Sequence, residues 1–201
     1  MNNAFWYGIT LALGLIVPLG AQNLFIFNQG ACHRKFLQVT PSIITAFLCD
    51  LVLILLAVSG VSLIVMTIPW LKNVIFSLGI LFLICMGRAI WNNGGTFAPI
   101  ATALSTKSQI IFALSASLLN PHAILDTIGI IGTNALQFTG SSKIAFTAAC
   151  IITSFIWFIS LAFAGRVFQK LDPNGLGIII MNKLSAVTMW LLAGYLILKL
   201  L

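Results

Sequence analysis

Two acidic side chains, Asp50 and Asp126, lie within long apolar segments, where a carboxylate is costly to bury. A charged residue at the centre of a membrane helix costs about 2.5 to 3.5 kcal/mol on insertion scales. The third acidic residue of the chain, Asp172, stands in the turn sequence Asp-Pro-Asn-Gly and suits a structural role. We interpret the first two as stations for a cation or a proton. The alternative is a buried ion pair with Arg88 or His122.

Two polar interruptions of the apolar pattern predict helices that stop and restart. The first follows Pro18, and the second is the sequence Asn-Pro-His at 120–122. Asn is favoured at the N-cap of a helix and Pro at its first position. A helix start presents free N–H groups and the positive end of the helix dipole, which together bind carboxylates. The candidate binding residues at the two breaks are therefore Pro18, Gly20, Gln22, Asn23, Asn120, Pro121 and His122, the histidine being either a proton relay or a neutral donor.

The elements that hold these residues are predicted to be membrane helices. The chain of 201 residues is 60% hydrophobic and 6% charged, whereas soluble domains carry about 25% charged residues. A membrane-spanning helix needs about 20 apolar residues, and six segments qualify: 4–27, 42–66, 70–91, 109–136, 144–165 and 178–200. The polar stretch 28–40 is predicted to be a loop. The fold class is therefore an all-α integral membrane protein with six hydrophobic helices, five or six of them spanning, of which helices 1 and 4 are broken.

The helices are predicted to form one transmembrane transporter domain, residues 1–201, built from two related halves. Each half, about 4–92 and about 107–201, begins with a broken helix. Because each contains three helices, the halves would have opposite orientations, which is the inverted-repeat plan of many secondary transporters. Of the ten basic residues, seven lie in or beside the connections that follow helices 1, 3 and 5, which predicts that these ends face the cytoplasm and that both termini lie outside. Asp50 would then lie toward the cytoplasmic half and Asp126 toward the outer half.

The sequence disfavours several other classes of function. It contains no nucleotide-binding motif of the type G-x-x-x-x-G-K-[ST], so transport would use an ion gradient or run downhill. Its four cysteines form no C-x-x-C pair and no metal-ligand pattern. The net charge is +7, but single basic residues between apolar segments are helix flanks rather than a nucleic-acid footprint. We therefore expect no enzyme activity, no cofactor, no bound metal and no nucleic-acid partner.

Four motifs follow one another along the chain. They are 18–23 (Pro-Leu-Gly-Ala-Gln-Asn) with Gln29-Gly30, then 49–54 (Cys-Asp-Leu-Val-Leu-Ile), 119–126 (Leu-Asn-Pro-His-Ala-Ile-Leu-Asp) and 154–158 (Ser-Phe-Ile-Trp-Phe). Together and in this order they resemble the LysE/ArgO family of basic amino-acid exporters, over essentially the whole chain. One departure is Ala21, which stands where the family motif often has proline, so the first break is less rigid than in the family pattern.

The resemblance implies a multi-pass exporter of L-lysine or L-arginine in the bacterial inner membrane, driven by the proton-motive force. It also implies that Asp50 and Asp126 match the family's two intramembrane acids, with a cationic amino acid, the proton and the lipid bilayer as partners. An exporter of neutral amino acids of the threonine or homoserine type is an alternative, and a membrane-embedded redox protein, enzyme or channel is a less favoured one. The redox branch of the superfamily needs paired cysteines in its proline-containing helices, and this chain has none there. A homo-oligomer is compatible with the sequence.

Overall fold

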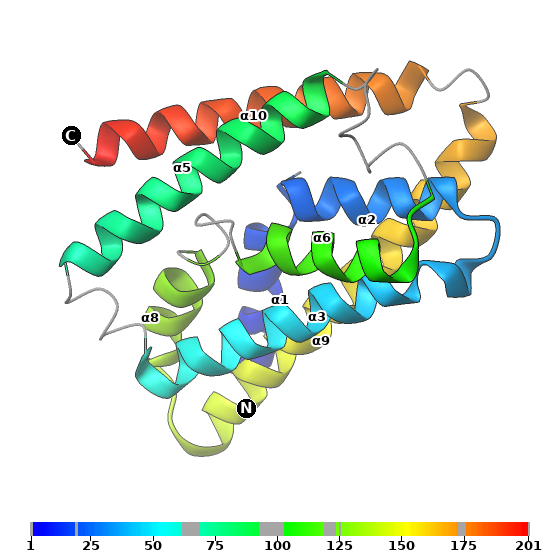
Figure 1. Ribbon diagram of the computed structural model, residues 1–201. Coiled ribbons are helices and arrows are strands. Elements are labelled where there is room, and N and C mark those ends of the chain that lie inside the picture. The colour runs from blue at the N-terminus through cyan, green and yellow to red at the C-terminus, as the bar shows by residue number, and fades with distance from the viewer. Residues whose placement is uncertain are drawn as a thin grey trace.

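The computed structural model is built of helices, with no strand among the residues it describes (Figure 1). It describes residues 2–18, 20–61, 69–92, 103–118, 124, 126–172 and 176–200. The α-helices are α1 (Asn2–Ile16), α2 (Ala21–Cys32), α3 (Thr40–Leu56), α5 (Pro69–Trp91), α6 (Thr106–Leu118), α8 (Gly132–Ala135), α9 (Gly140–Leu171) and α10 (Leu176–Leu200). A 3₁₀ turn, η1 (Phe36–Gln38), and two π-helical turns, η2 (Ala57–Val61) and η3 (Asp126–Ile131), complete the described elements. The predicted all-α membrane class is confirmed.

Three helices in the described parts are long and apolar enough to cross a membrane, namely Thr40–Val58, Gly140–Leu171 and Leu176–Leu198. The bent pair α1 and α2 adds a fourth span if it is counted as one. Large apolar side chains face outward at every fourth position of α3, as Ile44, Leu48 and Val52 do. An exposed apolar stripe of this kind suits contact with lipid. The count of five or six spans stays a prediction.

The chain turns sharply at Pro18, where α1 and α2 meet at an angle of 83°. Proline has no N–H group and its ring clashes with a preceding helical turn, so α1 ends at Ile16. The predicted break in helix 1 is therefore confirmed. The predicted break at Asn120 and Pro121 lies outside the described residues; before it α6 ends at Leu118, and after it η3 begins at Asp126.

Two predicted boundaries are wrong, the first because of tertiary contacts and the second because of a local backbone conformation. Helix α2 continues to Cys32, so residues 28–32 of the predicted loop 28–40 are helical. Their amides signalled a loop, but Asn28 and Gln29 are buried, and they bond to Asn182 of α10 and to the backbone N–H of Leu104. Helix α3 ends at Leu56 rather than near residue 66, because η2 follows it and Gly60 there has a φ of 94°. This left-handed conformation ends helices and favours glycine.

Helix α9 is longer than the predicted segment 144–165. Its 32 residues give a length of about 48 Å, against about 30 Å for the bilayer core. An untilted α9 is therefore longer than the apolar core, and its basic residues stand near its two ends, Lys143 at the start and Arg166 and Lys170 at the finish.

Helix α9 is the element on which most of the others pack. Helices α1, α2 and α3 contact it, while α6 packs against α3, and α5 packs against α10 (Figure 1). At the α2–α9 contact, Gly30 lies against the backbone of Ala162, and Gly165 lies against the backbone of Phe27. In terms of the two predicted halves, α1 and α2 of the first half pack on α9 of the second, α6 of the second half packs on α3 of the first, and α5 packs on α10. A reciprocal pairing of this kind is what an inverted repeat would give. The inverted repeat itself stays a prediction.

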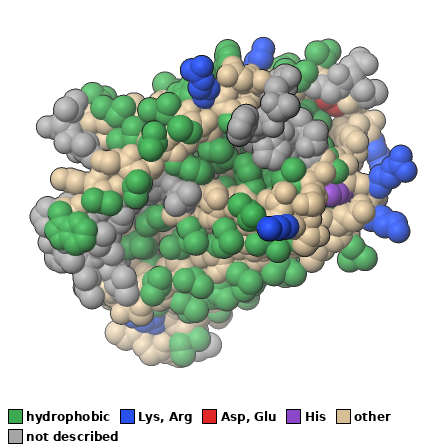
Figure 2. All heavy atoms as spheres, viewed as in Figure 1, with side chains coloured by type: hydrophobic (Ala, Val, Ile, Leu, Met, Phe, Trp, Pro, Cys, Tyr) green, Lys and Arg blue, Asp and Glu red, His purple; other side chains and the backbone are tan. Residues whose placement is uncertain are grey.

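Basic side chains gather at one end of the helices, which we name the basic end. It comprises the connection from α2 to α3, the start of α6 and the end of α9, which carry Arg34, Lys35, Lys107, Arg166 and Lys170. Arg166 Nη2 donates a 2.7 Å hydrogen bond to the carbonyl oxygen of Arg34 and joins two of these segments. At the opposite end α1 begins beside the start of α9, where the Tyr7 hydroxyl donates to Asn134 Oδ1 at 2.6 Å and its ring stacks on Phe146. Figure 2 shows basic side chains around the edges of the molecule and also within the visible face, much of which is covered by apolar side chains.

Candidate functional site

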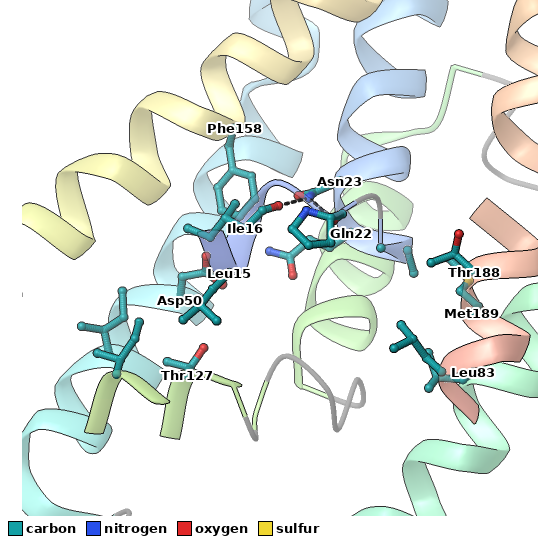
Figure 3. Close-up of a pocket in the computed structure, with 16 residues that line it drawn as sticks. Leu15, Ile16, Gln22, Asn23, Asp50, Leu83, Thr127, Phe158, Thr188 and Met189 are labelled. Carbon is teal, nitrogen blue, oxygen red and sulfur yellow. Dashed lines mark hydrogen bonds between the residues drawn. The ribbon is translucent and has the colours of Figure 1, made fainter. Parts of the chain in front are cut away.

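A cavity of about 110 Å³ lies at the break between α1 and α2 (Figure 3). A buried water molecule needs about 10 to 15 Å³ of such space, so the cavity has room for several water molecules. Its wall combines residues of α1, α2, α3, α5, η3, α9 and α10. The cavity therefore lies where the two predicted halves of the chain meet. The polar side chains on its wall are Gln22, Asn23, Asp50, Thr127 and Thr188.

Asp50 of α3 places a carboxyl group on the wall of this cavity. Ser154 Oγ of α9 donates a 2.7 Å hydrogen bond to Asp50 Oδ2, which fixes the carboxyl group between two helices. Among the described residues, the partner of Asp50 is thus a hydroxyl group rather than a cation. The alternative of an ion pair with Arg88 gains no support from the described residues, and His122 lies outside them.

Gln22, in the first turn of α2, turns its amide toward Asp50 (Figure 3). The side chain is 8% exposed, and its amide nitrogen has no hydrogen-bond partner among the described residues. Leaving such a donor unpaired in a buried site costs about 1 to 3 kcal/mol. Because this amide faces the Asp50 carboxyl group, the two side chains present a donor and an acceptor together on the cavity wall, and the binding role of Gln22 stays a prediction.

The backbone at the break is held by Asn23. Its amide nitrogen donates to the carbonyl oxygen of Ile16 and, at 3.0 Å, to that of Pro18, and carbonyl groups at a helix end have no partner within the helix. Gly20 is the N-cap residue of α2 and has an extended conformation without a side-chain cap. The first N–H groups of α2 therefore lie at the positive end of its dipole with no partner inside the helix. Pro18, Gly20 and Asn23 all line the cavity.

The predicted site residues of the second half are only partly described. Asn120, Pro121 and His122 lie outside the described residues, as does the side chain of Asp126. The backbone of Asp126 begins η3, and the next residue, Thr127, lines the cavity. The described part of the second half thus reaches the same cavity as the start of α2. The roles expected of these four residues stay predictions.

Sequence reasoning missed the hydroxyl groups at the site. From the sequence, Ser154 was named only as part of a motif, and Thr127 and Thr188 were not named. A hydroxyl group in an apolar helix commonly bonds to its own backbone, as Thr188 does at 2.9 Å to the carbonyl oxygen of Leu184. Spacing along one helix therefore gives no signal, and the meeting of Ser154 with a carboxyl group on another helix is visible only in three dimensions.

A second buried polar group is centred on Gln109 of α6, at the basic end. Ser42 Oγ donates to Gln109 Oε1 at 2.6 Å. The Gln109 amide nitrogen lies 2.9 Å from the carbonyl oxygens of Gln38 and Leu104 and 3.0 Å from His33 Nε2. The amide nitrogen has two N–H groups for these three neighbours, and His33 shares in them as an acceptor in the tautomer whose Nε2 carries no proton. The group ties the start of α6 to α3 and to the connection after α2.

Acidification is expected to destabilise the protein through His33. Burial lowers the pKa of His33 below its ordinary value, so as pH falls the unfolded chain takes up a proton before the folded chain does. The stability from a neutral His33 is complete above about pH 6.5 and is lost progressively below it. The melting temperature of the purified protein, measured on either side of about pH 6.5, should fall more for the wild type than for His33→Gln. Equal falls in the two proteins would contradict this role for His33.

A helical membrane protein with a bent first helix and a cavity whose wall holds an acidic side chain has the architecture of a membrane transport protein. Comparison with known protein families gives a specific assignment, since the LysE type translocator family matches residues 13–200. The chain belongs to the LysE type translocator family, and it is a multi-pass protein of the bacterial inner membrane. No solved structure matches it.

Three relatives illustrate the similarity. "Putative amino-acid transporter YisU" of Bacillus subtilis (strain 168) is 52% identical over 194 residues, which are 96% of this chain and 88% of the relative. "Arginine exporter protein ArgO" of Salmonella typhi is 30% identical over 207 residues, which cover 96% of this chain and 92% of the relative. YggA of Aeromonas hydrophila is 36% identical over 167 residues, covering 81% and 73%.

Proposed function

We propose that this chain is a secondary exporter of the basic amino acids L-arginine or L-lysine, coupled to the entry of protons. The observation that carries the proposal is the carboxyl group of Asp50 in the cavity at the start of α2. A basic amino acid has a carboxylate, which suits a helix start, and a cationic side chain, which suits an acidic residue. Relatives named as an amino-acid transporter and as an arginine exporter support the same substrate class.

Proton coupling is proposed from the energetics of moving a cation outward. Each positive charge that leaves against an inside-negative potential costs about 2.3 kcal/mol per 100 mV. Entry of one proton for each departing cation cancels this cost. A carboxyl group gives up its proton when it binds the cationic substrate, and it takes up a proton when the substrate leaves. Asp50 therefore suits an exchange of the substrate for a proton. Asp126 of the second half is the second candidate station.

The second broken helix is proposed to supply the rest of the site. Asn120 and Pro121 would form a second helix start for the substrate carboxylate, and His122 would relay a proton or donate to a carbonyl group. The contribution of Thr127 to the cavity wall supports this placement, since it follows directly on Asp126.

Amino-acid efflux from cells tests the proposal. Cells with and without the protein are loaded with dipeptides containing arginine or lysine, and their growth on the toxic arginine analogue canavanine is compared. We expect the protein to raise basic amino-acid efflux and canavanine resistance, and a protonophore to abolish the efflux. Efflux of threonine or homoserine instead would favour the neutral exporter, and no change for any cationic or neutral amino acid would refute export.

Ser154→Ala is expected to lower this efflux by about tenfold, because a hydrogen bond to a charged group contributes about 1.5 to 3 kcal/mol. The loss arises because Asp50 is no longer held in one orientation. Ser154→Thr keeps a hydroxyl group and should retain more efflux. Ser160→Ala is the matched control on the same helix, since the Ser160 hydroxyl bonds to the carbonyl oxygen of Ile156 at 2.8 Å. Equal efflux from the alanine variants at the two serines would exclude a positioning role for Ser154.

A further inference from the structure

A separate group of buried polar side chains lies between α2 and α10. Asn28 Nδ2 of α2 donates a 3.0 Å hydrogen bond to Asn182 Oδ1 of α10. Asn28, Asn182 and the nearby Ser185 of α10 are 1%, 2% and 1% exposed. None of the three is among the residues that line the cavity at the break. Two helices that are otherwise joined by apolar contacts thus enclose a polar group.

Two atoms of this group, Asn28 Oδ1 and Ser185 Oγ, have no hydrogen-bond partner in the structure described. Adhesion between helices accounts for the hydrogen bond between the two asparagines. It does not require the unpaired oxygens of Asn28 and Ser185. Ser185 also does not bond to its own helix, as Thr188 does one turn later. Buried polar atoms without partners cost free energy, so they indicate groups that are satisfied in another state or by a ligand.

The position of the group relative to the cavity is fixed by helix geometry. On α2, Ala21 lines the cavity, and Asn28 lies seven residues or about 10 Å further toward the basic end. On α10, Met189 lines the cavity, and Asn182 lies about the same distance toward the start of the helix. Helix α10 starts at the basic end, because its residue Gly177 lies against Phe168 near the end of α9. The polar group therefore lies between the cavity and the basic end.

We propose that Asn28, Asn182 and Ser185 form a second binding station, where the cationic group of the transported amino acid is held between the basic end and the cavity. The proposal rests on the proposed function. Ammonium and guanidinium groups only donate hydrogen bonds, and the unpaired oxygens of Asn28 and Ser185 are acceptors for them. The acceptors are neutral, so the station binds the cation less tightly than an acidic residue would and allows it to move on.

The apolar layer between the station and the cavity contains Leu24, Ala186 and Met189. This layer closes the route in the present conformation, so passage requires α2 and α10 to separate there. Two of these side chains favour such a movement: alanine leaves little to displace, and methionine is flexible and repacks easily.

The paired replacement Asn28→Leu with Asn182→Leu distinguishes a station from simple adhesion. Exchanging both partners of a buried hydrogen bond for apolar groups of similar shape leaves stability nearly unchanged or raises it. We expect wild-type protein levels and melting temperature, and arginine efflux reduced by about tenfold or more. Wild-type efflux from this paired variant would overturn the proposal, while the proposed function would stand.

A labelling experiment tests the station without relying on the paired variant. Ser185→Cys is introduced into a chain whose four native cysteines are replaced, and a cationic, membrane-impermeant methanethiosulfonate is added from the cytoplasmic side. We expect the introduced thiol to react and arginine to slow the reaction. Leu176→Cys is the matched control, since this position is 60% exposed at the first residue of α10, at the basic end, and arginine should give no protection there.

Each result of the labelling experiment decides the matter. A thiol at position 185 that does not react, or whose reaction arginine does not slow, would overturn the station. Failure of the proposed function would give a different result, because the wild-type protein would then export no basic amino acid. Failure of the station leaves wild-type efflux intact.

Discussion

Asp50→Asn is expected to reduce arginine and lysine efflux by at least about thirtyfold, since truncating one partner of a buried charged contact costs about 2 to 5 kcal/mol. Asparagine is close to aspartate in size, and its amide oxygen is able to accept the hydrogen bond from Ser154. The fold should therefore be kept, while the negative charge and the site for a proton are lost. The measurement is efflux from dipeptide-loaded cells, normalised to the amount of protein in the membrane.

The same substitution at the third acidic residue is the matched control. Asp172 Oδ2 accepts a 3.1 Å hydrogen bond from the backbone N–H of Ile178, where it helps to join α9 to α10. An asparagine oxygen serves that purpose equally well, so Asp172→Asn should export at the wild-type rate. The proposal that intramembrane carboxylates carry the cation and the proton would fail if Asp50→Asn and Asp126→Asn both kept full efflux at normal protein levels.

The chemistry at the break is predictable from the sequence because its signals are local. Pro18 lacks an N–H group, and Asn23, which bonds across the break, is only five residues away. Asp50 is recognisable because acidic residues are so rare in this chain. Ser154 is different, because its partner lies 104 residues away in the sequence and a serine in an apolar helix has many ordinary roles. The contact exists only because α9 packs against α3.

The sequence predicts the ends of a helix only where the helix ends at the same residues as the apolar run. Asn28 and His33 suggest a loop, since amide and imidazole groups rarely face lipid. In the structure they face other helices instead, where Asn28 bonds to Asn182 and His33 meets Gln109. Tertiary contacts thus supply the partners that local sequence reasoning assigns to water. The choice of those partners is a property of helix packing, which an apolar run does not encode by itself.

Gly30→Ala and Gly165→Ala are expected to destabilise the protein by about 3 kcal/mol or more, at the upper end of overpacking effects or beyond. A Cβ atom on Gly30 would overlap the carbonyl group of Ala162, and one on Gly165 would overlap the carbonyl group of Phe27. A side chain is able to move aside by changing rotamer, but these obstacles are backbone atoms of a neighbouring helix. The two helices would have to separate along their whole contact. Thermal melting of the purified protein should show the loss, at about 2 to 4 °C per kcal/mol for a chain of this size.

Gly194→Ala should instead increase the stability of the protein. No atom lies within 4 Å of the position that its Cβ would occupy, so alanine there mainly restricts the unfolded chain and stabilises by about 0.4 to 1 kcal/mol. Equal melting temperatures for the alanine variants at Gly30, Gly165 and Gly194 would contradict the close contact of α2 with α9. The contact also matters for the cavity, because Gln22 and Asn23 lie on the same short helix as Gly30. A displaced α2 moves these side chains relative to Asp50, so efflux should fall in the first two variants and persist in Gly194→Ala.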